Sequence, residues 1–133
     1  MKTAKKPNVV VNIIKEEKGY GATAKIDDKF IATNGDSFDE LKEMVVDAVN
    51  LAVEEEGLQY AFEEFKLAYD MESFFAFYKV INAKALSKRI GMNQSLLSQY
   101  ISGIKKPSSK QTHRILSEVQ QIGKELSEVR FLL

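Results

Sequence analysis

The sequence predicts an α+β domain followed by an all-α domain. Strand-like segments with turn signals come first, capped helical segments come last, and the sign of the charge changes between them. Residues 1–78 carry 9 Lys and Arg against 16 Asp and Glu, whereas residues 79–133 carry 10 against 3. Such asymmetry is typical of two domains with different partners. We therefore expect one domain at residues 1–72 and a second at residues 73–133.

Composition excludes several classes of protein. Of the 133 residues, 44% are hydrophobic and 29% are charged, which is the balance of a globular chain. The absence of cysteine and the single histidine exclude disulfides, thiol catalysis and Cys/His zinc sites. No apolar run approaches the roughly 20 residues of a membrane span, and the N-terminal apolar stretch is too short for a signal peptide. We expect a cytoplasmic protein without a cofactor.

The first domain begins with three expected strands and a helix. Turn signals at Lys18-Gly19 and Asp27-Asp28 separate β-branched segments, and the short loops favour antiparallel pairing. Ser37, with Glu40 three residues later, forms a capping box that starts a helix. One apolar face of that helix is expected to pack on the sheet: Phe38, Leu41, Val45, Ala48 and Ala52.

A fourth strand and an aromatic segment follow. Alternation of Phe65, Leu67 and Tyr69 with polar or small residues predicts a half-buried strand, which completes a βββαβ unit. The next segment, MESFFAFYKV, predicts a short helix. Its crowded rings favour a packing seam between the domains over a binding platform.

Three helices are expected in the second domain. Asn82, Asn93 and Ser108 are their caps, and Gly91 and Gly103 end the first two. Apolar residues in the third helix follow a 4-3-4-3 spacing that fits either an intramolecular core or a dimer seam: Ile115, Val119, Ile122, Leu126 and Val129.

The first two of these helices have the pattern of a helix-turn-helix, whose second helix lies in the DNA major groove. The contact between the helices is expected to use small or apolar residues: Ala85, Leu86, Ile90, Met92, Leu97 and Tyr100. The second helix would then expose polar, uncharged side chains that suit base edges, with one leucine able to meet a thymine methyl: Gln94, Ser95, Leu96, Ser98 and Gln99. Cations that could contact phosphates surround them: Lys84, Lys88, Arg89, Lys105, Lys106, Lys110 and Arg114.

The segment NAKALSKRIGMNQSLLSQYISGIKKPSSKQTHRI resembles the helix-turn-helix of phage repressors of the XRE/Cro type. The resemblance covers about 50 residues, with Gly91 and Gly103 twelve positions apart. It implies that Gln94, Ser95 and Gln99 contact bases, with Leu96 beside them. It also implies that three further residues contact phosphates: Asn82, Asn93 and Lys105.

The first domain resembles the HicB antitoxin domain, a partial RNase H-like fold, in its GY-containing hairpin and its NGDS helix start. It has KIDDKFIATNGD where the family usually has a Pro-Asp-Leu-Pro-Gly-Cys loop. The resemblance implies a type II antitoxin whose first domain covers a HicA-like, mRNA-cleaving toxin and whose second domain represses its own operon at operator DNA. The alternative is an orphan DNA-binding regulator whose first domain mediates oligomerisation. A homodimer or higher homo-oligomer is expected in either case, since one short helix reads few base pairs.

An enzyme is not expected. An RNase H-like fold directs attention to carboxylates for a two-metal site, but the candidates fall in a turn or at a helix start: Asp27, Asp28, Asp36, Asp39 and Glu40. His113 has no acid or nucleophile at motif spacing. We therefore expect no catalytic residue and no metal ligand.

Overall fold

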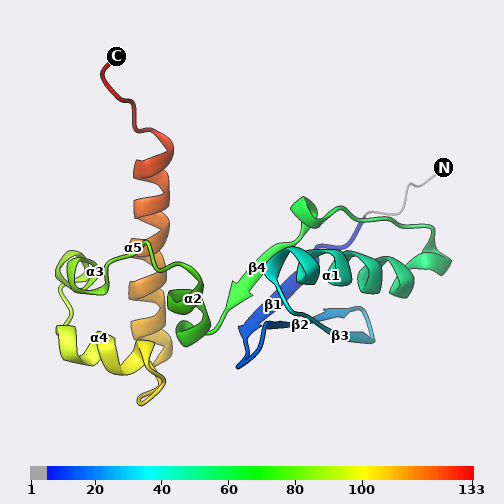
Figure 1. The fold of residues 1–133 in the computed structure, drawn as a ribbon, viewed down its shortest axis with the longest axis horizontal. Coiled ribbons are helices and arrows are strands. Elements are labelled where there is room, and N and C mark those ends of the chain that lie inside the picture. Colours follow the sequence, from blue (N-terminus) through cyan, green and yellow to red (C-terminus); the bar gives the residue numbers. More distant parts are fainter. Residues whose placement is uncertain (1–5) are drawn as a thin grey trace. The chain divides into compact units, whose positions relative to one another are not determined.

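A computed structural model describes residues 6–133, and the chain divides into two compact units, Met1–Phe77 and Tyr78–Leu133 (Figure 1). The first unit is α+β with a four-stranded mixed sheet, and the second contains helices. Helix α2 (Met71–Phe77) belongs to the first unit, although residues 73–77 are expected from sequence in the second domain. Within the part of the chain that the structure describes, no helix is long and apolar enough to cross a membrane.

The sheet of the first unit has the strand order β3-β2-β1-β4. Strands β1 (Val10–Lys15), β2 (Tyr20–Ile26) and β3 (Lys29–Gly35) form the expected antiparallel meander. Strand β4 (Lys66–Tyr69) pairs with β1 in parallel after the crossover through α1. Gly19 (φ 78°) and Asp27 (φ 55°) take left-handed conformations in the two hairpin turns, which explains a glycine and an aspartate at these positions.

Helix α1 (Phe38–Ala52) packs on one face of this sheet (Figure 1). The Ser37 hydroxyl accepts the expected capping bond from the Glu40 N–H at 3.1 Å. The Glu40 carboxylate accepts from the Asp36 N–H, one residue earlier than a capping box requires. The buried side chains are four residues apart: Leu41, Val45, Val49 and the C-cap residue Val53. Two alanines that were expected in the buried stripe are only half-buried, Ala48 and Ala52.

Two short 3-10 turns, Glu54–Glu56 and Phe62–Glu64, connect α1 to β4. The Asn50 side chain holds this connection with two hydrogen bonds to the Tyr60 backbone: Nδ2 donates to the carbonyl at 3.1 Å and Oδ1 accepts from the N–H at 2.7 Å. The second turn therefore lies against α1, where the two elements form a groove described below.

Helix α2 packs against β1 and β4. The Phe77 ring lies 4.6 Å from Phe38 and 5.7 Å from Tyr20, centroid to centroid, and Phe75 is buried. These aromatic contacts of α2 are internal to the first unit, whereas the sequence predicts a seam between the domains at this segment.

The second unit contains α3 (Ala83–Ile90), α4 (Gln94–Ile101) and α5 (Ser109–Ser127), with the expected caps Asn82, Asn93 and Ser108. Its buried side chains come from all three helices and the first turn: Leu86, Ser87, Met92, Leu97, Tyr100 and Ile115.

The prediction that Ala85 packs in the contact between α3 and α4 is wrong. Ala85 is exposed, and Ser87 takes the buried position with 2% of its surface accessible. The 3.6-residue period explains this, because Leu86, Ser87 and Ile90 share a side of α3 that Ala85 does not. The Ser87 hydroxyl donates to the Lys84 carbonyl at 2.7 Å, so its burial leaves no unsatisfied donor.

Candidate nucleic-acid interface

A three-residue turn joins α3 to α4. Gly91 (φ 77°) ends α3 in the left-handed conformation, and the Met92 N–H donates to the Ser87 carbonyl at 2.9 Å. Asn93 Oδ1 then accepts from the N–H groups of Ser95 (2.8 Å) and Leu96 (3.3 Å). Because a backbone hydrogen bond closes the first end of the turn, the Asn93 side chain closes the second and Met92 is buried, the direction of α4 relative to α3 is set locally.

Helix α4 separates its packing side from its polar side. Leu97 and Tyr100 are buried, whereas the exposed positions form a continuous arc on the opposite side at 100° per residue: Gln94, Ser95, Ser98 and Gln99. Leu96 is half-buried at the border of this arc. Three of the four residues expected to contact bases are thus exposed together on one helix, and the fourth adjoins them.

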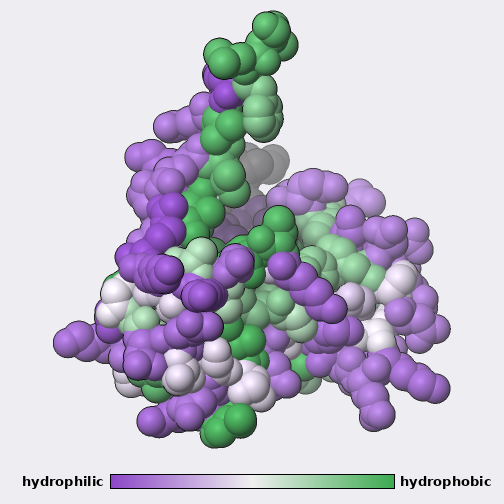
Figure 2. Space-filling model, turned by 60° about the vertical axis from the view of Figure 1, so that its left-hand side comes forward, coloured by the Kyte–Doolittle hydropathy of each residue, from purple (hydrophilic) through white to green (hydrophobic). Residues whose placement is uncertain are grey.

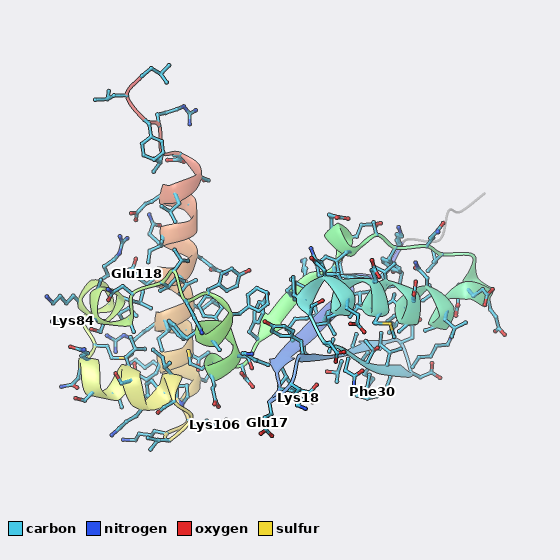
Figure 3. The ribbon with its side chains drawn as sticks, in the orientation of Figure 1. Glu17, Lys18, Phe30, Lys84, Lys106 and Glu118 are labelled. Atoms are coloured by element: carbon cyan, nitrogen blue, oxygen red, sulfur yellow. The ribbon has the colours of Figure 1, made fainter. Side chains whose placement is uncertain are left out.

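Five lysines on the segments that precede and follow α4 have no ion-pair partner among residues 6–133. They are exposed and come from α3, the loop after α4 and the first turn of α5: Lys84, Lys88, Lys105, Lys106 and Lys110. Figure 3 shows Lys84 extending from α3 away from α5. Together with the helix N-termini, these groups give the unit a positive surface around an uncharged helix face.

The caps Asn82 and Asn93 keep part of their expected role. Asn82 Oδ1 accepts from the Ala85 N–H at 2.9 Å, and Asn93 Oδ1 accepts from the Ser95 N–H at 2.8 Å. The amide NH₂ group of each side chain is the donor that a phosphate oxygen would require. These two residues could therefore cap a helix and contact a phosphate at the same time.

Arg89 and Arg114 have partners within the second unit, unlike the five lysines, and their contact with phosphates stays a prediction. Arg89 Nη2 lies 3.2 Å from Glu118 Oε2 and 2.6 Å from Glu125 Oε2, which ties α3 to α5. Arg114 donates from Nη2 to the Ile90 carbonyl at 3.1 Å, at the end of α3. A guanidinium satisfies several acceptors at once, which explains why the arginines and not the lysines hold the helices together.

Hydrogen bonds from Arg89 lower the pKa of Glu125. The hydrogen bonds that Arg89 makes with Glu125 and Glu118 raise the pKa of Arg89. We predict that the stability which Arg89 adds is present above about pH 4.5, the ordinary pKa of Glu125, and is lost as pH falls through the lowered value. Urea unfolding of wild type and Arg89→Gln across pH 3 to 7 (roughly the range of that titration) checks this. A stability difference that grows on acidification would contradict it.

An open depression lies between α3 and the first half of α5, lined by Arg89, Ile90, Lys110, His113, Arg114, Ser117 and Glu118. His113 Nδ1 lies 2.8 Å from the Ser109 carbonyl, so this nitrogen carries the proton in the neutral ring. Among residues 6–133, no three His, Asp or Glu side chains gather as they would around a metal ion.

The first unit has an acidic groove between α1 and the turn Phe62–Glu64, lined by Asp39, Lys42, Glu43, Val46, Asp47, Phe62 and Glu63. Lys42 is partly neutralised by Asp39 at 3.6 Å, and its ammonium lies 5.7 Å from the Phe62 ring centroid. Sequence reasoning identified an acidic domain but missed this groove. The signal was the four-residue spacing of Asp39, Glu43 and Asp47, which places three carboxylates along one side of α1.

Comparison of the chain with family models, with curated proteins and with solved structures gives no match.

Proposed function

We propose that this protein is an antitoxin that binds operator DNA through α3 and α4 and binds a basic toxin through its acidic first unit. The observation that carries the DNA-binding part is the exposed, uncharged arc of α4 with five unpaired lysines around it among the described residues. Base edges are bound by neutral donors and acceptors, and phosphates by cations. The second unit separates these two kinds of group in that way.

In the proposed complex, α4 lies in the major groove. Gln94 and Gln99 can each form two hydrogen bonds with adenine N6 and N7, and Ser95 can bond either kind of base edge. Leu96 would reach a thymine methyl with the part of its side chain that remains exposed. The lysines and the amide groups of Asn82 and Asn93 would contact phosphates and fix the register of α4 along the DNA.

Lys105→Ala is expected to weaken binding to all DNA sequences by a similar factor and to reduce the slope of log K against log salt concentration by about 0.9, because one phosphate contact is lost. Titration of two unrelated duplexes by fluorescence anisotropy at several salt concentrations measures both quantities. Lys18→Ala, in the β1–β2 hairpin of the first unit, is the control (Figure 3). Loss of affinity for one duplex alone would contradict a phosphate role for Lys105.

The acidic groove supports the partner part of the proposal. Four carboxylates and one lysine line it, and Phe62 and Val46 supply apolar surface between them. A protein that binds and cleaves mRNA has a basic surface, which this groove would attract over a distance and then contact. Occupation of that basic surface would exclude the RNA. A HicA-like toxin is therefore the partner that we propose.

Co-expression of the full chain with the product of a short, basic neighbouring reading frame tests the antitoxin role. A stable complex that no longer cleaves RNA is expected. Glu43→Lys combined with Asp47→Lys should prevent its formation, whereas Glu17→Lys in the β1–β2 hairpin should not (Figure 3). An uninhibited toxin in the presence of excess wild-type protein would refute the proposal.

One observation favours the alternative of an orphan DNA-binding regulator. Strand β3 is an edge of the sheet, and Phe30 on this strand is 70% exposed. Exposed edges with apolar side chains pair readily with other chains. If no basic protein binds and Phe30→Lys dissociates the oligomer, the first unit serves self-association and the antitoxin role is wrong.

A further inference from the structure

The four strands that the structure describes in the first unit contain no Asp or Glu, although residues 1–78 contain 16 of them. These acidic residues all lie in helices, turns or loops. Each strand contains one lysine instead: Lys15, Lys25, Lys29 and Lys66. The sheet is therefore positive within a unit whose net charge is negative, and it can attract a ligand that the rest of the unit would repel.

Two of these lysines lie on the face of the sheet opposite α1, which we call the open face. Side chains alternate along a strand, so exposed Val10 and Lys25 lie on the side opposite their buried neighbours. In the strand register, Lys66 on β4 pairs with Val10 on β1, and Lys25 on β2 pairs with Phe30 on β3. Since β1 and β2 place Val10 next to Lys25, the four residues form one row across the sheet, about 14 Å long at roughly 4.8 Å per strand.

Phe30 is the aromatic residue of this row. Its neighbour Lys29 donates to the Ala52 carbonyl at the end of α1, so Phe30 projects from the opposite side of the sheet, where its ring is 70% exposed (Figure 3). The adjoining row holds small or uncharged side chains: Ala68, Asn12, Thr23 and Ala32. A planar group could therefore lie flat on Phe30 without meeting a bulky neighbour.

The adjoining row also offers hydrogen-bonding groups. Asn12 Nδ2 donates to Thr23 Oγ1 at 3.4 Å, which leaves the side-chain carbonyl of Asn12 and the hydroxyl hydrogen of Thr23 for a ligand. The open face thus combines one exposed ring, two cations and a pair of neutral polar side chains. Neither Lys25 nor Lys66 has an ion-pair partner among residues 6–133.

We propose that the open face binds single-stranded nucleic acid. Lys25 and Lys66 contact phosphates, and Phe30 stacks on a base. Asn12 and Thr23 bond to base edges, which a single strand leaves accessible. This inference goes beyond the proposed function, because it gives the first unit a nucleic-acid site of its own and depends neither on an operator nor on a toxin.

The chemistry of the open face favours a single strand over other occupants. In a duplex, neighbouring bases cover each other, so a ring on a sheet finds no base to stack on. A basic toxin would be repelled by Lys25 and Lys66, and the acidic groove beside α1 suits it better. Two copies of the chain paired through this face would bring four lysines together with no carboxylate from the strands between them.

Fluorescence anisotropy of the full chain with labelled oligouridine of about 12 nucleotides tests the open face. An excess of unlabelled random duplex is added to occupy the second unit. We expect binding that Phe30→Ala weakens by about 5- to 150-fold, because one stack of a base on a ring is lost. Lys25→Gln should lower the slope of log K against log salt concentration by about 0.7, the value for one phosphate of a single strand.

Oligothymidine of the same length distinguishes RNA from DNA as the ligand. Tighter binding of oligouridine would show contacts with the 2′-hydroxyl, and equal binding would show that bases and phosphates suffice; both results support the site. Oligouridine that contains 4-thiouridine should crosslink under light to peptides from β1, β2 and β3.

Two matched controls should bind as wild type does. Phe131→Ala removes a phenylalanine that is 88% exposed in the second unit, where the end of the chain is hydrophobic (Figure 2). Lys18→Gln removes an exposed lysine from the β1–β2 hairpin. The inference is wrong if wild type does not bind, if Phe131→Ala weakens binding as much as Phe30→Ala, or if the crosslinks are confined to the second unit. A change of mass in sedimentation of Phe30→Ala would also overturn it, because Phe30 would then lie in a contact between copies.

Discussion

Gln94→Ala is expected to weaken binding to the specific operator by about 1–3 kcal/mol, which is roughly 5- to 150-fold, while binding to unrelated DNA changes little. Gln94 is the first residue of α4 and is exposed, so its amide can reach a base edge. Removal of the amide deletes a bidentate contact with one base and leaves the phosphate contacts intact. The loss should therefore be confined to one position of each half-site.

The measurement begins with operator selection from random duplexes, followed by anisotropy titrations of the selected duplex and its single-base variants. Gln120→Ala is the matched control, because Gln120 is an exposed glutamine on α5, outside the proposed interface. Wild type should discriminate against a substitution that the Gln94 variant tolerates. Equal discrimination by both proteins would remove Gln94 from base recognition.

Leu97→Ala is expected to destabilise the second unit by about 2–5 kcal/mol, because Leu97 is fully buried and its truncation leaves a cavity. Alanine favours helix, so the loss would come from packing and not from the backbone of α4. A unit of this size has little stability to spare. We expect it to unfold well below the temperature at which the first unit unfolds.

Thermal and urea unfolding, followed by circular dichroism and by hydrogen exchange in each unit, checks this prediction. Leu51→Ala, at an exposed leucine of α1, should change the free energy of unfolding by no more than about 0.5 kcal/mol. DNA binding should be lost in step with unfolding of the second unit. A Leu97 variant that is fully folded and yet fails to bind would place Leu97 in the interface instead of the core.

The turns and caps were predicted correctly because they depend on residues close in sequence. Ser37 Oγ bonds to the N–H three residues later, Asn82 and Ser108 do the same, and Gly91 ends α3. A helix cap is formed by one side chain and the N–H groups of the next few residues, so it can be predicted from those residues alone. The exposed arc of α4 follows from the helical period once its caps are known.

The burial errors arose where two faces of a helix were nearly equivalent in sequence. Ala85 and Ser87 are both small, and only the direction of α4 and α5 decides which of them is enclosed. Val49 on α1 and its C-cap residue Val53 are buried more deeply than the expected alanines, because the side of the helix that faces the sheet follows residues four apart. The helical period shows which residues form an apolar stripe, but it does not show which part of the stripe a neighbouring helix or sheet covers.

Local sequence predicts the elements, their caps and the polar arc of α4, because these depend on interactions within about four residues, and the charge difference between the units follows from composition. The partners of the long side chains depend instead on how the helices pack against one another. Arg89 pairs with Glu118 and Glu125, which lie 29 and 36 residues away, so no local pattern could predict these partners. Tertiary packing also left the end of α5 exposed, since α3 is too short to cover a 19-residue helix.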